Sequence, residues 1–325
     1  MAILFSKNSG LNDDFWKPVG QVLQSVMNDL DSEKGQYDKF VADVFNEKTS
    51  KKYAEKTATL TSIGNMTITG EGDAAPIDDI HEAEPKLIVH STFQNGFSCT
   101  KEMKDDGDID VMKAASQNLV RSYKRTRAQL ASDALVTEGA AFTFSGKSLD
   151  KTTGDGAGLF ATNHAGNQSN VFTNAFSQQM LVRLANIGRN YRNASGNVQG
   201  YTFDTIIIPS NCYALEEEIR KIIRSELQPG TNNNDINTQK GLWNLIVDPC
   251  WQVADNSAPY IVMSKEANKE LQAAMFYDRT PLDVANWVDN PTRNLQWTGY
   301  ARMSAGFRDF RAFILGGAKV GTTLS

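Results

Sequence analysis

The chain has 325 residues, of which 40% are hydrophobic and 22% are charged. These fractions are those of an ordinary globular protein, and the length suits two linked subdomains better than one simple core. The formal net charge of -5 and the pI of about 5.4 argue against a general nucleic-acid binder that works by neutralising phosphates. The three cysteines, Cys99, Cys212 and Cys250, are far apart and odd in number, so we expect no disulfide framework and a reducing compartment.

The N-terminal segment is polar overall. It lacks the long apolar core of a signal peptide, and no run in the chain approaches the roughly 18 apolar residues that cross a bilayer. We therefore expect a soluble protein without a membrane partner. Modest helical periodicity around Phe15, Val19, Leu23 and Met27 predicts a peripheral arm with one short helix over residues 1–50.

The next segment predicts a long two-stranded ribbon. Residues 56–70 are typical of an extended strand, which would reach about 50 Å at ~3.3 Å per residue, and a partner strand is expected over 86–102. In that return strand one face should carry Leu87, Val89, Phe93, Phe97 and Cys99, and the other Lys86, His90, Thr92 and Gln94. A ribbon of this size cannot bury its own faces, so we expect it to lie on a second copy of the same chain.

The loop between the two strands is acidic. Residues 71–85 contain no Lys or Arg, and the candidate interface residues in this tip are Glu71, Asp73, Asp78, Asp79, Glu82 and Glu84. A helix is then predicted over 108–138, which has no Gly or Pro and starts after the capping sequence Asp106-Gly107-Asp108. This helix carries a basic patch of Arg121, Lys124, Arg125 and Arg127. The patch is interpreted as a solvated helix face, as a partner for the acidic tip of a neighbouring subunit, or, third, as a nucleic-acid contact.

Residues 144–170 are rich in Gly, Ser, Thr and Asn and mark a boundary. From 170 to about 290 the pattern predicts a small α/β subdomain. Its elements are a helix over 176–191, a buried strand at 205–209, a second helix capped by Ser210 or Asn211, and strands near 242–248, 260–263 and 271–277. After Pro291 an alternating strand is expected to return to the long helix.

The sequence contains no credible catalytic group of residues. Gly146-Lys147-Ser148 lacks the upstream glycine of a phosphate-binding loop and is interpreted as an ordinary loop. The glycines at 154, 156 and 158 do not lead into a helix and are interpreted as turn residues. His81, His90 and His164 lack metal-ligand spacing and are interpreted as solvated loop residues. Cys212, beside a helix start, is the best nucleophile candidate but has no evident base. We therefore expect no catalysis, no metal and no cofactor.

The order of arm, long ribbon, long helix, α/β subdomain and terminal strand resembles the tailed-bacteriophage major capsid proteins of the Hong Kong 97 fold. More narrowly, it is similar to the Mu-type major head subunits. The local motifs are Leu159 to His164, Ile206 to Ser210, Asn237 to Gly241, Phe276 to Pro281 and Gly306 to Arg311.

The resemblance implies an α+β fold with four parts: an N-terminal arm (1–50), an extended β-hairpin loop (51–104), a peripheral domain (105–164 and 291–325, with the spine helix over 108–138) and an axial domain (165–290). It implies a major head protein of a tailed bacteriophage that self-assembles into hexamers and pentamers of an icosahedral shell. The shell would enclose double-stranded DNA without sequence-specific binding, in a virion assembled in the host bacterial cytoplasm.

Two departures from the family pattern bear on its chemistry and partners. Some members join subunits through a lysine of the extended loop, but residues 57–85 contain no lysine, so we expect no such bond. Only about 50 residues precede the ribbon, so either the scaffold is a separate protein or a prepeptide is missing from this sequence, and the starting Met1 favours the separate protein. A portal and a decoration protein are further expected partners. The alternatives are an encapsulin-like nanocompartment shell and, from a different class, a soluble α/β enzyme with Cys212 as its nucleophile.

Overall fold

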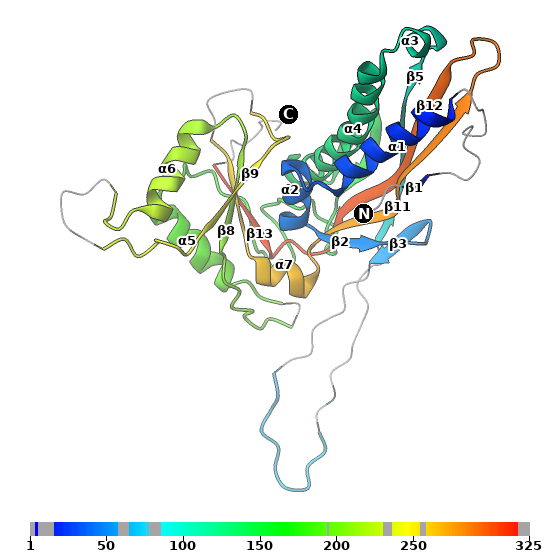
Figure 1. Cartoon of the computed structure of the whole chain (residues 1–325). Coiled ribbons are helices and arrows are strands. Elements are labelled where there is room, and N and C mark those ends of the chain that lie inside the picture. Colours follow the sequence, from blue (N-terminus) through cyan, green and yellow to red (C-terminus); the bar gives the residue numbers. More distant parts are fainter. Residues whose placement is uncertain are drawn as a thin grey trace.

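The described chain forms two main sheets, joined by several chain crossings, and two small two-stranded sheets. One long limb, whose described residues are 54–57, 65–75, 77 and 86–89, projects from the larger sheet (Figure 1). The computed structural model describes residues 4–5, 16–57, 65–75, 77, 86–193, 195–229, 236–253 and 258–317. Helices and strands occur in both halves, so the predicted α+β class is what the structure has.

The larger sheet has the order β1-β11-β12-β5, and β2 also pairs with β11. Its two longest strands, β11 (Ala274–Val288) and β12 (Leu295–Phe307), form an antiparallel hairpin. On the other side of β12 lies β5 (Ser91–Cys99), while β1 (Leu4–Phe5) and β2 (Asn46–Thr49) run parallel to β11. Along β12 buried and half-buried residues alternate as the sequence predicted, because every second side chain points toward the helix layer.

The long helix α4 (Ile109–Val136) crosses one face of this sheet, within two residues of the predicted bounds. At 1.5 Å per residue it is about 42 Å long. Asp108 is its N-terminal cap residue, although its side chain makes no capping hydrogen bond, and Gly139 beyond the C-terminus has a φ of 90°. The short helix α3 (Lys101–Asp105) precedes it and is capped by the Thr100 hydroxyl, which accepts from the Met103 N–H.

The N-terminal region differs from the predicted arm with one short helix. It contains two helices, α1 (Lys17–Ser32) and α2 (Gln36–Val44), and both pack on α4. Trp16, Leu23 and Met27 are fully buried in the same core as α4 and the far end of β12. The described part of this region is therefore built into the body of the subunit.

The smaller sheet has the order β13-β10-β8-β9 and carries two helices beside it (Figure 1). The strands β8 (Thr205–Pro209) and β10 (Tyr260–Met263) match their predicted bounds, and β9 spans Asn244–Asp248. The helices α5 (Gln178–Arg189) and α6 (Tyr213–Arg224) pack on one side, and the final strand is β13 (Phe313–Gly316). The residue that caps α6 is Cys212, one position later than predicted. The short helix α7 (Lys265–Leu271) was not predicted.

The ribbon is shorter than the sequence predicted. Its two strands, β3 (Ala54–Thr57) and β4 (Lys86–Val89), pair only with each other, and residues 65–70 have no regular secondary structure. The predicted return strand breaks at His90, and its second part, β5, pairs with β12 instead of with the outgoing strand. The predicted buried face is correct for β5 but wrong for β4. In and next to β4, Ile88 and His90 are buried, whereas Leu87 and Val89 are exposed. Residues 58–64 lie outside the described part of the chain.

A small hairpin lies near the C-terminal end of α4. Its strands β6 (Ala141–Phe144) and β7 (Lys147–Asp150) are joined by Ser145 and Gly146, whose φ values are 47° and 78°. Two positive φ values are the requirement of a two-residue type I′ turn. The turn is therefore formed by Ser145 and Gly146, whereas Lys147 and Ser148 begin β7, so the predicted loop at Gly146-Lys147-Ser148 is correct only at Gly146.

Candidate functional site

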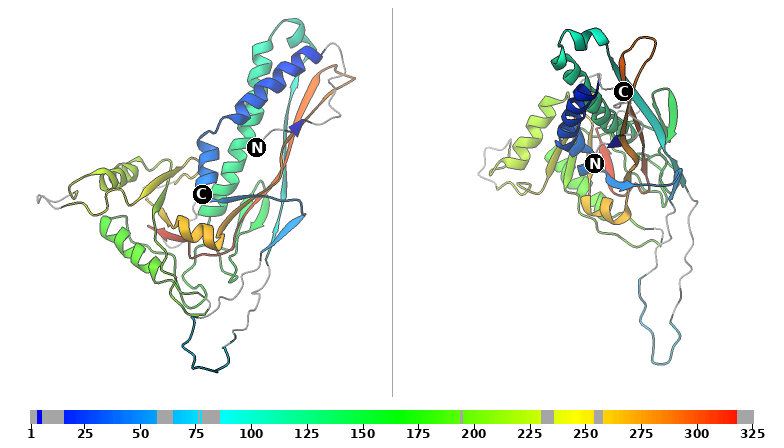
Figure 2. Two further views of the ribbon diagram at one scale, coloured as in Figure 1. Left: turned by 60° about the horizontal axis from the view of Figure 1, so that its bottom comes forward. Right: turned by 45° about the vertical axis from the view of Figure 1, so that its right-hand side comes forward.

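The limb is the most exposed part of the described chain. Residues 65–75 lie well away from both sheets in Figure 1 and in the right-hand view of Figure 2. Met66, Ile68 and Ile77 are almost entirely exposed to solvent. Leaving such apolar side chains in water forgoes about 1.5–3 kcal/mol each relative to burying them. Exposed apolar groups gathered on one projecting segment mark a surface that contacts another molecule.

The base of the limb is packed firmly onto the larger sheet. Ile88 of β4 lies against Met275 and Tyr277 in a small buried cluster on the sheet. It also fills the space above Gly306, where an added Cβ would lie only 2.5 Å from Ile88 Cδ1. Lys86 Nζ donates to the Thr152 carbonyl and lies 3.3 Å from Asp150 Oδ2. The limb therefore has a fixed base and an uncovered outer part.

The basic residues predicted on the long helix do not form one exposed patch. Lys124 is buried, and its ammonium group donates to the carbonyl oxygens of Leu30, Asp31 and Glu33 at 3.0, 3.2 and 2.5 Å. It also lies 3.1 Å from Asp38 Oδ2. These carbonyls belong to the C-terminal end of α1, whose partial negative charge favours a cation. Lys124 thus holds α1 and α2 on α4, and its charge is used inside its own chain.

Arg127 is also paired with acidic residues of its own chain. Its Nη2 lies 2.8 Å from Glu47 Oε1 on β2 and 2.8 Å from Asp278 Oδ2 on β11, and its guanidinium lies over the Phe276 ring. Burial raises the pKa of the Asp278 carboxyl, while the neighbouring Arg127 works to lower it. Asp278 and Asp38 could not be recognised as partners from the sequence, because 151 residues separate Asp278 from Arg127 and no local pattern joins them.

Arg121 and Arg125 are the two members of the predicted patch that stay exposed. Of the acidic tip, Glu71 and Asp73 are described, and both are exposed on the outer part of the limb. Asp78, Asp79, Glu82 and Glu84 lie outside the described residues. Within one subunit the described tip projects away from α4 (Figure 2). The predicted pairing between tip and helix therefore needs a second copy.

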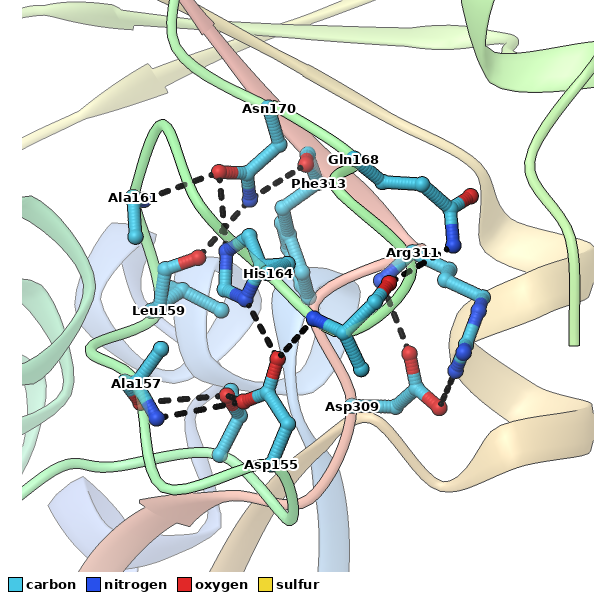
Figure 3. A network of polar contacts seen from close by, with 12 residues as sticks. Asp155, Ala157, Leu159, Ala161, His164, Gln168, Asn170, Asp309, Arg311 and Phe313 are labelled. Atoms are coloured by element: carbon cyan, nitrogen blue, oxygen red, sulfur yellow. Dashed lines mark hydrogen bonds and ion pairs between the residues drawn. The ribbon is translucent and has the colours of Figure 1, made fainter. Parts of the chain in front are cut away.

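Two of the three histidines are buried and hydrogen-bonded, contrary to the expectation of solvated loop residues; His81 lies outside the described part. His164 Nδ1 lies 2.8 Å from Asp155 Oδ2 and Nε2 lies 3.1 Å from Asn170 Oδ1 (Figure 3). The His164 ring stacks on Phe310 with ring centroids 3.7 Å apart. Asn170 in turn donates to the Phe313 carbonyl at the start of β13.

This network joins the loop at 153–170 to the chain crossing between β12 and β13, so His164 has a structural role. Burial works to raise the pKa of Asp155. Hydrogen bonds from His164, Thr153 and the Ala165 N–H outweigh that effect and hold the pKa below its ordinary value. The Gly158 position in the same loop has no room for a side chain, because a Cβ would lie 2.2 Å from the Gly139 carbonyl oxygen.

Cys212 does not have the properties of an activated nucleophile. Burial raises the pKa of its thiol, so the thiolate is disfavoured at neutral pH. No group of three or more His, Cys, Asp or Glu side chains with metal-binding geometry occurs among the described residues. No helix in the described chain is long and apolar enough to span a membrane.

Solved structures share this architecture at low sequence identity. The capsid of a native GTA particle is 11% identical, with a TM-score of 0.56, over 87% of this chain and 90% of that chain. Mycobacterium phage Patience gives 10% identity and a TM-score of 0.54 over 100% and 95% of the two chains. The SrpI encapsulin complex from Synechococcus elongatus PCC 7942 gives 10% identity and a TM-score of 0.53 over 90% and 91%. A search of curated protein sequences found no match.

These likenesses define the class of fold, which is the Hong Kong 97-like fold of phage capsids, as predicted. A family model described as phage capsid protein matches residues 82–316. The chain therefore belongs to the phage capsid protein family. Its function is that of a major capsid protein, as the resemblance to this family implied.

Proposed function

We propose that the chain is the repeating subunit of a tailed-phage head of the Mu type, arranged in hexamers and pentamers of an icosahedral shell around double-stranded DNA. The observation that carries the proposal is the limb, whose apolar residues Met66, Ile68 and Ile77 have no cover on their own subunit among the described residues. The assembled copies supply that cover. The shell forms in the host bacterial cytoplasm and becomes part of the virion.

The parts of the subunit take distinct roles in this proposal. Residues 1–50 are proposed as the N-terminal arm, whose helices α1 and α2 pack on the body of the subunit. Residues 51–104 are proposed to contain the extended loop that lies over an adjacent subunit, whereas β5 within this range belongs to the larger sheet. Residues 105–164 and 291–325 are proposed as the peripheral domain and 165–290 as the axial domain around the capsomer centre. Two strands depart from this division, because β11 lies in the larger sheet with β12 and β13 lies in the smaller sheet with β10. A separate scaffolding protein, a portal and a decoration protein are proposed partners, and DNA is enclosed without sequence-specific contacts.

The acidic tip and the exposed part of α4 are proposed to meet between subunits. Arg121 and Arg125 keep their charges at the surface, whereas Lys124 and Arg127 are paired internally. Glu71 and Asp73 are exposed at the far end of the limb. A single exposed ion pair contributes only about 0–1 kcal/mol. Repetition over a shell makes such contacts significant for assembly.

Electron microscopy of the purified full chain tests the shell proposal. We expect rings or closed shells, because the limb requires a neighbouring copy to cover its apolar residues. A monodisperse monomer that persists at high protein concentration would contradict the proposal. The measurement needs no variant and uses the protein as it exists.

A charge-reversal variant tests the interface residues separately. The double substitution Arg121→Glu and Arg125→Glu is expected to weaken assembly by about tenfold or more in the protein concentration required, because acidic tips then face acidic side chains. The matched control is Lys265→Glu with Lys269→Glu on the exposed side of α7, which changes the net charge equally. Light scattering across a concentration series measures the effect. Equal weakening in both variants would assign it to net charge and remove α4 from the interface.

A further inference from the structure

His90 lies where the limb joins the larger sheet. It follows β4 directly and precedes β5, and only 4% of its surface is exposed. Its ring contacts three other segments: Ser50 in the approach to β3, Ser304 on β12 and, edge to face with centroids 6.0 Å apart, Tyr277 on β11. One side chain therefore connects both strands of the limb base to the two longest strands of the sheet.

The hydrogen bonds around His90 fix the form of its ring. The Ser50 hydroxyl donates its single hydrogen to Glu55 Oε1 at 2.6 Å and accepts from the Lys52 N–H at 3.1 Å. It can only accept a further bond, so His90 Nε2, 3.1 Å away, must carry a hydrogen. His90 Nδ1, 2.9 Å from Ser304 Oγ, is then the acceptor for the Ser304 hydroxyl. The neutral ring with its hydrogen on Nε2 satisfies every partner.

We propose that neutral His90 holds the base of the limb on the larger sheet and that protonation of His90 releases it. A second proton would go to Nδ1 and turn it from an acceptor into a donor. The Ser304 hydroxyl would then have to rotate and lose its bond to the ring nitrogen. The resulting imidazolium would be a buried charge, which is costly without a direct counter-charge. Release of β3 and β4 exposes the ring to water and removes that cost.

The pKa of His90 is governed first by burial and then by three charged groups of opposite sign. Burial lowers the pKa of His90 below its ordinary value, Glu55 on β3 works to raise it, and Arg279 on β11 and Arg302 on β12 lower it further. The released form titrates near the ordinary value of about 6.5. Below that pH the released form binds a proton that the packed form does not. As the pH falls from 6.5 toward the lowered pKa of the packed His90 ring, the ratio of released to packed limb base therefore rises by up to about tenfold per pH unit.

Hydrogen exchange read by mass spectrometry measures the release. On the full chain, amide protection in β3 and β4 at pH 7 and pH 5 is compared after correction for the intrinsic exchange rate. We expect protection in these strands to fall several-fold at pH 5, while protection in β8 and β10 stays unchanged. A uniform loss of protection across both sheets would indicate global acid unfolding and would overturn the proposal.

The variant His90→Gln separates the proton effect from the packing. A glutamine side chain offers one donor and one acceptor, so it can bond to Ser50 and Ser304 without titrating. We expect this variant to keep its β3 and β4 protection at pH 5, while His164→Gln leaves the pH-dependent loss of protection in the limb base in place. Retention of the full pH effect in His90→Gln would overturn the proposal.

Nitrogen NMR of histidine-labelled wild-type protein is a second measurement that needs no variant. At pH 7 the proposal requires a His90 ring with its hydrogen on Nε2 alone. A ring with its hydrogen on Nδ1, or one already doubly protonated, would overturn it. The proposed effect of His90 protonation occurs within one chain, so disproving it would leave the shell proposal untouched. Both hydrogen exchange and NMR could also be measured on a protein that stays monomeric.

Discussion

Arg127 joins three parts of the subunit that are far apart in the sequence. It belongs to α4, and its guanidinium binds Glu47 on β2 and Asp278 on β11. Only 6% of Arg127 and 2% of Asp278 is exposed, so the pair is shielded from water. A buried ion pair contributes little net stability when intact, but it becomes costly when one partner is removed.

The substitution Arg127→Met is therefore expected to destabilise the subunit by about 3–5 kcal/mol, because the Asp278 carboxylate is left buried without a counter-charge. Urea-induced unfolding of the dissociated chain measures the loss. Adding Asp278→Asn to this variant should recover a substantial part of the stability, since a neutral amide is cheaper to bury than a charge.

The matched control is Arg125→Met on the exposed side of the same helix. Its effect on the free energy of unfolding should stay within about 0.5 kcal/mol. If Arg127→Met and Arg125→Met cost the same, the ion pair does not determine the stability of this layer. No recovery by Asp278→Asn would lead to the same conclusion.

At the residue scale the sequence predicted that the helix has a basic face but not how that face is divided. A single sequence does not show which of the four basic residues are buried and which are exposed. They lie within six positions of one another, and helical periodicity does not separate the two sides of the helix over so short a distance. The four residues are Arg121, Lys124, Arg125 and Arg127. The division depends on Asp38 and Asp278, which reach the helix only through tertiary packing. His90 and His164 were misjudged for the same reason, because burial of a polar residue depends on distant partners.

At the element scale the predictions succeeded where one segment carries a strong periodic or apolar signal. The strand Thr205–Pro209 is a short apolar run that is buried on both faces, and α4 is a long stretch without Gly or Pro. Such patterns are enforced by local geometry whatever the surroundings. The bounds of β8 and β10 could therefore be predicted to the residue.

Prediction failed where pairing partners decide the structure. The alternation from Leu87 to Cys99 predicts one strand, but the chain passes from one sheet to another at His90. The buried and half-buried side chains lie at even-numbered positions before this point and at odd-numbered positions after it. Residues 65–70 have strand-like composition but no pairing partner among the described residues, and they are not a strand. The helix α7 has only seven residues, too few for a clear periodic signal.

At the scale of the whole molecule the limb is a separable addition to a well-packed body. The β3–β4 ladder closes with Thr57 opposite Lys86, so the two strands could be joined there by a tight turn. Ile88, His90 and Lys86 fix the base on the body by contacts that do not involve the outer limb. The body therefore has what it needs to fold alone, whereas assembly depends on the outer part.

Replacing residues 58–85 by Asn-Gly, a two-residue turn that suits an antiparallel hairpin, tests this division. We expect a folded subunit whose urea midpoint stays close to that of the full chain, because the described residues that are removed, 65–75 and 77, are exposed. We also expect no rings or shells by electron microscopy, because the apolar surface that neighbouring copies would cover is gone. If the shortened chain assembles as readily as the full chain, the limb is not what holds the copies together. If it fails to fold, the limb belongs to the core of its own subunit.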